Sequence, residues 1–268
     1  MTQLVRVDGV DVLIDGEGAQ SVMMIHGWPD THRLWDATVQ ALQREYRCVR
    51  FTLPGFEAGT PRRSYPVVEL VARFKAIVEQ TCPGQPVTLL LHDWGCAFGY
   101  AFAAQHPALV SRIVGVDIGD AGSHGHVRSL RLADKLMIVA YQGWLAIAWR
   151  LGGRAGEWMT RWMARALHCP SDPAFIGSQM NYPYWQQWTG GGAKPAAAAF
   201  VPACPMLCVY GTKKPFMFHS PAWAEALALR PGCRVLAFET GHWVMSRRPE
   251  PFSQAVLAWL GRAPDHWA

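Results

Sequence analysis

The sequence lacks the features that define several protein classes. Its seven cysteines are odd in number, widely spread and without a CxxC pair, which argues against a disulfide framework or a structural zinc site. No charged segment followed by an apolar segment opens the chain, so nothing indicates export. We therefore expect a cytoplasmic protein with reduced thiols.

Long apolar runs and charge clusters are also absent. The most apolar stretch, residues 136–149, is too short to span a bilayer, and it predicts an amphipathic or buried helix with no transmembrane segment. The formal charge is +5, but Lys and Arg are scattered, so no nucleic-acid partner is expected. Charged residues make up 17% of the 268 positions and hydrophobic residues 50%, which fits one α/β domain with an insertion.

Strand-like and helix-like segments alternate along most of the chain. Residues 1–16 alternate like strands, and apolar β-branched runs follow at 21–25, 47–53, 87–91, 112–117, 205–210 and 233–238. Helical patterns bounded by Pro, Gly or Ser lie between them, at 66–80, 96–106, 221–229 and 251–260. This order predicts a mostly parallel sheet with helices on both faces.

The alternation stops between residues 121 and 200, where no strand-like run occurs. We interpret 121–200 as a helical cap over a core formed by 1–120 and 201–268. Its tail, 189–200, lacks the Walker spacing and predicts a flexible linker. His124 and His126 have no further ligands nearby in the sequence, so we expect a mobile loop at the start of the cap and no metal site.

The segment "VTLLLHDWGCAFG" has the layout of a nucleophile elbow: a strand, a sharp turn and a helix. Asp93 stands at the tip of the turn, and Gly95 and Cys96 are small enough to let the strand and the helix approach. The helix N-terminus would keep Asp93 ionised, as an attacking carboxylate requires. The alternative is an ordinary aspartate N-cap.

Two other segments are expected to lie near Asp93 and to supply a base and an oxyanion loop. "MIHGWPD" carries His26 to Pro29 at a strand end, and "ETGHW" places His242 after the last strand. With "LPGF" at 53–56, these motifs resemble the α/β-hydrolase fold superfamily, in its branch with an aspartate nucleophile, the epoxide hydrolases and haloalkane dehalogenases. The resemblance covers nearly the whole chain. No GxSxG motif occurs, which disfavours a serine esterase.

The resemblance implies the α/β-hydrolase fold, with a mostly parallel eight-stranded sheet and a helical cap, and a cofactor-independent reaction. Asp93 would form an ester with the substrate, and His242 would activate the water that hydrolyses it. Backbone N–H groups of Trp28 and Trp94 would bind the oxyanion, and Pro29 would follow a cis bond.

The third member of the triad departs from the usual pattern. Where the family usually has an acid in "GTxD", this sequence has Lys214. A lysine cannot orient a histidine cation, so either the site is inactive or the acid comes from elsewhere. The family offers a second location at the end of the sixth strand, which here is Asp117, and Asp120 is the fallback.

The leaving group decides the substrate class. Epoxide hydrolases protonate an alkoxide with cap tyrosines; by position these correspond to Tyr141 and Tyr184, with Tyr182 close behind as a substrate-binding candidate. The alternative for each is an aromatic that packs the cap. We therefore predict hydrolysis of an apolar epoxide to a vicinal diol. The six tryptophans between residues 144 and 188 favour a small apolar substrate.

Two other functions stay open. Trp94 occupies a halide-binding position of dehalogenases, although Trp28 stands where those enzymes usually have Asn or Glu. Carbon–halogen hydrolysis with the same Asp93 and His242 is thus the alternative reaction. A non-catalytic scaffold that binds a ligand or a partner is the alternative class, motivated by Lys214. A homodimer is also left open.

Overall fold

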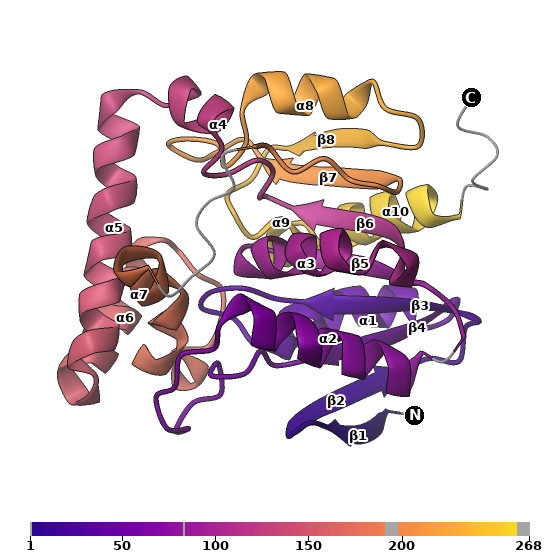
Figure 1. Ribbon diagram of the computed structural model, residues 1–268, viewed down its shortest axis with the longest axis horizontal. Helices are drawn as coiled ribbons and strands as arrows, with labels where there is room; N and C mark the ends of the chain where they lie inside the picture. The colour runs from indigo at the N-terminus through magenta and orange to yellow at the C-terminus, as the bar shows by residue number, and fades with distance from the viewer. Residues whose placement is uncertain (1, 83, 191–197, 262–268) are drawn as a thin grey trace.

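A single sheet organises the part of the chain that the structure describes. The computed structural model describes residues 2–82, 84–190 and 198–261. Within them the eight strands lie in the order β1-β2-β4-β3-β5-β6-β7-β8 (Figure 1). Their bounds are Gln3–Val7, Val10–Asp15, Gln20–Ile25, Tyr46–Phe51, Val87–His92, Val110–Val116, Met206–Gly211 and Arg234–Phe238, from β1 to β8. Only the β1–β2 and β2–β4 pairs are antiparallel, so the predicted mostly parallel sheet is confirmed.

The central strands are buried on both faces. Along β3, Met23 and Ile25 belong to one hydrophobic cluster, and Val22 and Met24 belong to the other. Successive side chains of a strand point to opposite faces, so a strand covered on both sides must be apolar at every position. This explains the continuous apolar runs of the sequence.

Helices supply the covering layers on each face. One hydrophobic cluster includes residues of α2 (Val67–Thr81), α3 (Trp94–Gln105) and α8 (Pro221–Ala228). The other includes residues of α1 (Asp36–Leu42), α9 (Val244–Arg247) and α10 (Pro249–Leu260). Figure 1 shows α2 and α3 in front of the sheet and α1, α9 and α10 behind it. The chain thus has the predicted three-layer arrangement.

The described residues between β6 and β7 form helices joined by turns and loops. The helices are α4 (His124–Ser129), α5 (Leu132–Leu151), α6 (Gly153–Ala166) and α7 (Tyr182–Thr189). In Figure 1, α5, α6 and α7 lie beyond the carboxyl ends of the parallel strands, while α4 lies near α8. The boundaries of a cap at 121 and 200 remain a prediction, and residues 191–197 of the predicted linker lie outside the described residues.

The expected mobile loop around His124 and His126 is wrong, because these residues form α4. The Ser123 side chain caps the helix by accepting a hydrogen bond from the N–H of His126 at 3.0 Å. The ring of His126 is buried and lies 3.1 Å from the N–H of Gly122 and 2.9 Å from the carbonyl of Met217. A capped and anchored turn has little freedom to move.

The apolar stretch at 136–149 forms the middle of α5, a helix of 20 residues. Within the described residues, no helix combines the length and the apolar character needed to cross a membrane. All seven cysteines are free thiols, and five of them are buried. The cytoplasmic location stays a prediction.

Candidate active site

The elbow holds Asp93 in an unusual backbone conformation. Asp93 stands between β5 and α3 with φ 52° and ψ −124°, a region that residues with a side chain rarely adopt. The turn is tight because α3 starts against β3: a Cβ on Gly95 would lie 2.3 Å from the carbonyl oxygen of Ile25. Only glycine allows this approach, which lifts Asp93 above the carboxyl edge of the sheet.

Two backbone N–H groups converge on the Asp93 carboxylate. The N–H of Trp28 donates to Asp93 Oδ1 at 2.7 Å, and the N–H of Trp94 also bonds to the carboxylate. The loop fits closely, since a Cβ on Gly27 would lie 2.4 Å from Asp93 Oδ1. The bond between Trp28 and Pro29 is cis, as expected. The arrangement has the geometry of an oxyanion hole for a charge that develops on the Asp93 side chain.

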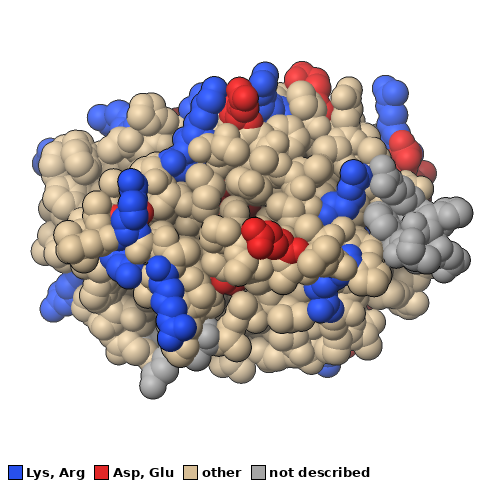
Figure 2. Space-filling model, turned by 90° about the horizontal axis from the view of Figure 1, so that it is seen from above, with Lys and Arg blue, Asp and Glu red and all other residues tan. Residues whose placement is uncertain are grey.

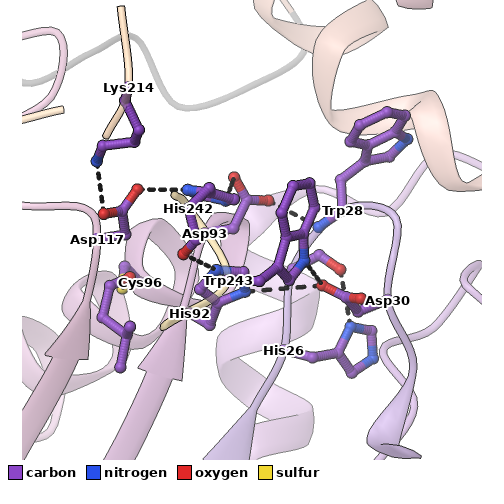
Figure 3. A network of polar contacts seen from close by, with 12 residues as sticks. His26, Trp28, Asp30, His92, Asp93, Cys96, Asp117, Lys214, His242 and Trp243 are labelled. Atoms are coloured by element: carbon purple, nitrogen blue, oxygen red, sulfur yellow. Dashed lines mark hydrogen bonds and ion pairs between the residues drawn. The ribbon is translucent and has the colours of Figure 1, made fainter. Parts of the chain in front are cut away.

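His242 lies between two carboxylates (Figure 3). Its Nε2 is 3.5 Å from Asp93 Oδ2, and its Nδ1 makes a short hydrogen bond with Asp117 Oδ2. Asp117 is fully buried directly after β6, where it has φ 73°. The structure therefore brings together the three residues that the sequence analysis proposed as nucleophile, base and acid.

Lys214 contacts Asp117, the predicted acid. Its Nζ is 2.5 Å from Asp117 Oδ1, and the N–H of Gly211 donates to the same oxygen at 3.0 Å. Asp117 thus uses one carboxylate oxygen for His242 and the other for Lys214. A lysine at the usual acid position is therefore compatible with a hydrogen bond between His242 and Asp117.

Asp120, the fallback acid, is engaged elsewhere. Its carboxylate accepts hydrogen bonds from the hydroxyls of Ser123 and Ser220 at 2.7 and 2.8 Å, and from the N–H of Ser220 at 2.6 Å. These contacts tie α4 to the start of α8. The structure pairs His242 with Asp117 and not with Asp120.

The charges of Asp93, His242 and Asp117 raise the pKa of the histidine and lower the pKa of both carboxyl groups. Burial alone would lower the pKa of His242, but Asp117 and Asp93 raise it to about 9. Burial would raise the pKa of Asp93 and of Asp117, but hydrogen bonds and charge from His242 lower both, and Lys214 contributes at Asp117. At neutral pH the site thus holds two carboxylates and an imidazolium.

Tyr184 and Tyr141 face this site from the cap. The Tyr184 ring makes edge contacts with the rings of Trp28, Trp94 and Tyr141, at centroid distances of 5.8, 5.3 and 6.1 Å. Burial, followed by a smaller effect of the Asp93 charge, raises the pKa of Tyr184; burial and Asp93 also raise the pKa of Tyr141. Both phenols are therefore protonated donors at neutral pH.

Tyr182 is not brought into the site. It is fully buried, and its ring packs against Phe56 and Tyr65 at centroid distances of 5.7 Å each. Its hydroxyl has no hydrogen-bond partner among the described residues. For Tyr182 the packing alternative describes the structure better than a role in substrate binding.

Sequence analysis missed a buried polar cluster behind His242. Asp30, fully buried, accepts hydrogen bonds from Trp243 Nε1 at 2.9 Å and from the Ser171 hydroxyl, and lies 3.7 Å from His92 Nδ1. The His92 ring lies 4.5 Å from that of His242, centroid to centroid. Burial raises the pKa of Asp30 to about 6 and lowers that of His92 to about 3. The signal was present: Asp30 ends "HGWPD", and His92 precedes the nucleophile.

A family model also matches the chain. The model of the α/β hydrolase fold matches residues 20–146, which contain the elbow and the oxyanion loop. The chain is similar to this fold family over those residues, which make up slightly less than half of its length. An epoxide hydrolase from Bacillus megaterium has the same fold, with a TM-score of 0.73, 17% identity, and coverage of 97% of this chain and 100% of that one.

The chain matches its curated relatives only over a part of their length. "Probable oxidoreductase EphD" of Mycobacterium tuberculosis is 35% identical over 94 residues, which are 33% of this chain and 16% of that protein. "Cis-3-alkyl-4-alkyloxetan-2-one decarboxylase" of Xanthomonas campestris is 31% identical over 109 residues, which are 37% of this chain and 35% of that protein.

Proposed function

We propose that the protein hydrolyses an apolar epoxide to a vicinal diol through an ester on Asp93. The proposal rests above all on one juxtaposition: a carboxylate at a nucleophile elbow faces two protonated tyrosines, Tyr184 and Tyr141, across the edge of the cap. The B. megaterium protein with this fold is an epoxide hydrolase, which agrees with the proposal.

The first step needs an ionised nucleophile and a proton for the leaving oxygen. An oxygen of Asp93 attacks an epoxide carbon, a C–O bond of the ring breaks, and its electron pair goes to the ring oxygen. Tyr184 or Tyr141 donates its phenolic proton to that oxygen. The lowered pKa of Asp93 and the raised pKa of both tyrosines keep each group in the required protonation state.

The second step needs a neutral base, and ester formation supplies it. With both carboxylates ionised, His242 has a pKa of about 9 and is a cation. Once Asp93 is an ester its charge is lost, so the pKa of His242 falls and His242 gives up its proton, which restores the phenol of the tyrosine. The neutral imidazole can then accept a proton from water. The hydroxide attacks the ester carbonyl, the N–H groups of Trp28 and Trp94 bind the oxyanion, and its collapse releases the diol and restores Asp93.

The indole of Trp28 favours an epoxide over a haloalkane. A halide leaving group needs N–H donors, but Trp28 Nε1 already donates to Asn181 Oδ1 at 2.6 Å. The Asn181 amide in turn donates to the Thr160 hydroxyl at 2.7 Å, which holds its carbonyl in place. Trp94 makes a side-chain hydrogen bond with Tyr184. To bind a halide, both indole N–H groups would have to give up these hydrogen bonds. An alkoxide can instead accept a proton from Tyr184 or Tyr141 without such a change.

The intact mass of a His242→Gln variant tests the proposal. This variant keeps the nucleophile but blocks water activation, so the ester should accumulate when the protein is incubated with one apolar epoxide or haloalkane at a time. We expect an adduct equal to the whole epoxide, located on the peptide that contains Asp93. The double variant Asp93→Asn/His242→Gln is the control and should form no adduct.

The other outcomes reassign the function. An adduct equal to an alkyl group, with halide released, would make the reaction dehalogenation. No adduct from any substrate, with the wild-type protein also inactive, would favour a non-catalytic scaffold.

A further inference from the structure

The outward surface of the cap carries apolar and cationic side chains that the site does not use. On α5, Leu132, Leu136, Val139, Ile147 and Leu151 are exposed, and Leu136 retains 60% of its accessible surface. These positions recur at helical spacing and form one stripe along the helix. An amphipathic helix normally turns such a stripe toward the core, but here the stripe faces outward.

The neighbouring helix α6 continues this surface with aromatic rings. Trp158 and Trp162 are exposed, and both contact Trp144 of α5, at centroid distances of 6.2 and 5.2 Å. Trp144 therefore joins the stripe on α5 to the tryptophans on α6. We call this continuous area the cap surface; it consists of Leu132, Leu136, Val139, Trp144, Ile147, Leu151, Trp158 and Trp162.

Arginines border the cap surface. Arg154, Arg161 and Arg165 share one face of α6 with Trp158 and Trp162, and the five side chains line a shallow groove together with Glu157. Residues 121–170 contain seven Lys and Arg but only two Asp and Glu, so they carry a charge equal to the net +5 of the whole chain. In Figure 2, several Lys and Arg side chains lie over the left part of the face, where the cap lies, and others are spread over the rest of it.

From this charge pattern we propose that the cap surface docks onto an anionic lipid bilayer. Tryptophan and leucine side chains enter the boundary between headgroups and acyl chains, and arginines bind lipid phosphates beside them. A second copy of this chain fits less well, because two such faces would place their excess arginines against each other. Docking leaves the core exposed to water and orients the cap toward the lipid.

Sedimentation with vesicles tests the docking directly. We expect the wild-type protein to sediment with vesicles of phosphatidylcholine and phosphatidylglycerol, but not with vesicles of phosphatidylcholine alone, and we expect added salt to weaken the binding. The variant Arg154→Glu/Arg165→Glu should bind at least about 30-fold more weakly. Its matched control, Arg44→Glu/Arg234→Glu, changes two exposed arginines of the core and should bind like the wild type.

A second pair of variants tests how much the apolar side chains contribute to vesicle binding. Leu136→Ser/Trp158→Ser should lose at least about tenfold in binding, because two side chains no longer enter the bilayer. Val68→Ser/Leu229→Ser replaces two apolar residues of the core that are 71% and 86% exposed, and should keep the wild-type affinity. Circular dichroism establishes that each variant is folded.

Three outcomes would overturn the proposal. The first is no sedimentation with anionic vesicles at low salt. The second is equal loss of binding in the cap and core variants, which would mean that only net charge matters. The third is a stable dimer in analytical ultracentrifugation that Leu136→Ser/Trp158→Ser dissociates, which would assign the cap surface to a second copy.

Discussion

Replacing Asp117 with Asn should destabilise the protein through Lys214, and removing Lys214 as well should restore part of the stability. In the wild-type protein the ammonium, only 7% exposed, lies 2.5 Å from a carboxylate that is not exposed at all. At an effective dielectric constant of about 20, such charges attract each other by about 7 kcal/mol, which offsets a desolvation cost of several kcal/mol per ion. Asp117→Asn removes the attraction and leaves the cost.

Breaking a buried pair from one side typically costs about 3–5 kcal/mol, and we expect a loss of that size for Asp117→Asn. The double variant Asp117→Asn/Lys214→Met should regain at least about 2 kcal/mol, because no buried ammonium is left without its counter-charge. Lys214→Met alone should cost less than Asp117→Asn, since Asp117 keeps its hydrogen bonds from His242 and from the N–H of Gly211.

Urea unfolding at neutral pH, followed by tryptophan fluorescence, measures the three variants against the wild type. A recovery of about 2 kcal/mol corresponds to a shift of the midpoint of about 1 M. The reasoning is refuted if the double variant is no more stable than Asp117→Asn, because the two side chains would then contribute independently.

Three further predictions follow from the same geometry. Because the pKa of His242 is raised, its protonation stabilises the folded state fully below pH 6.5, and this stabilisation is lost as the pH rises through 9. Between these two pH values the free energy of unfolding of the wild-type protein should fall by about 3 kcal/mol more than that of His242→Gln. Denaturant titrations at both pH values measure the difference. Gly27→Ala should lower epoxide turnover at least about 100-fold in a folded protein, because the new methyl group displaces Asp93, and wild-type turnover would contradict the assigned site. Tyr184→Phe should reduce the rate of ester formation at least about 100-fold while Tyr182→Phe leaves it unchanged; stopped-flow alkylation distinguishes the two, and equal effects would count against the packing role of Tyr182.

The fold and the position of Asp93 on a sharp turn could be predicted from sequence because their signals are local. A run that is buried on both faces must be apolar at every position, and the elbow needs small residues directly after Asp93. Each of these requirements lies within a dozen consecutive residues. The fold class predicted from the sequence is confirmed; the roles of Asp93 and His242 remain predictions for the mass experiment.

The helix faces of the cap could not be assigned in the same way. Tyr182 and Tyr184 are two positions apart at the start of α7, and residues two apart on a helix point about 200° from each other. Only one of them can therefore face Asp93. Which one does so depends on how α7 packs on the core, and the local sequence pattern does not predict that packing.

The partner of Lys214 was equally out of reach. By itself the sequence determined that the usual acid is missing and that Asp117 stands at an alternative position. The tertiary structure decided that Asp117 and Lys214, 97 positions apart, form an ion pair, and that the other carboxylate oxygen of Asp117 contacts His242. A sequence motif reflects the steric requirements of one turn and its neighbouring residues. The ion pair between Asp117 and Lys214 depends instead on the sheet, which brings the ends of β6 and β7 together.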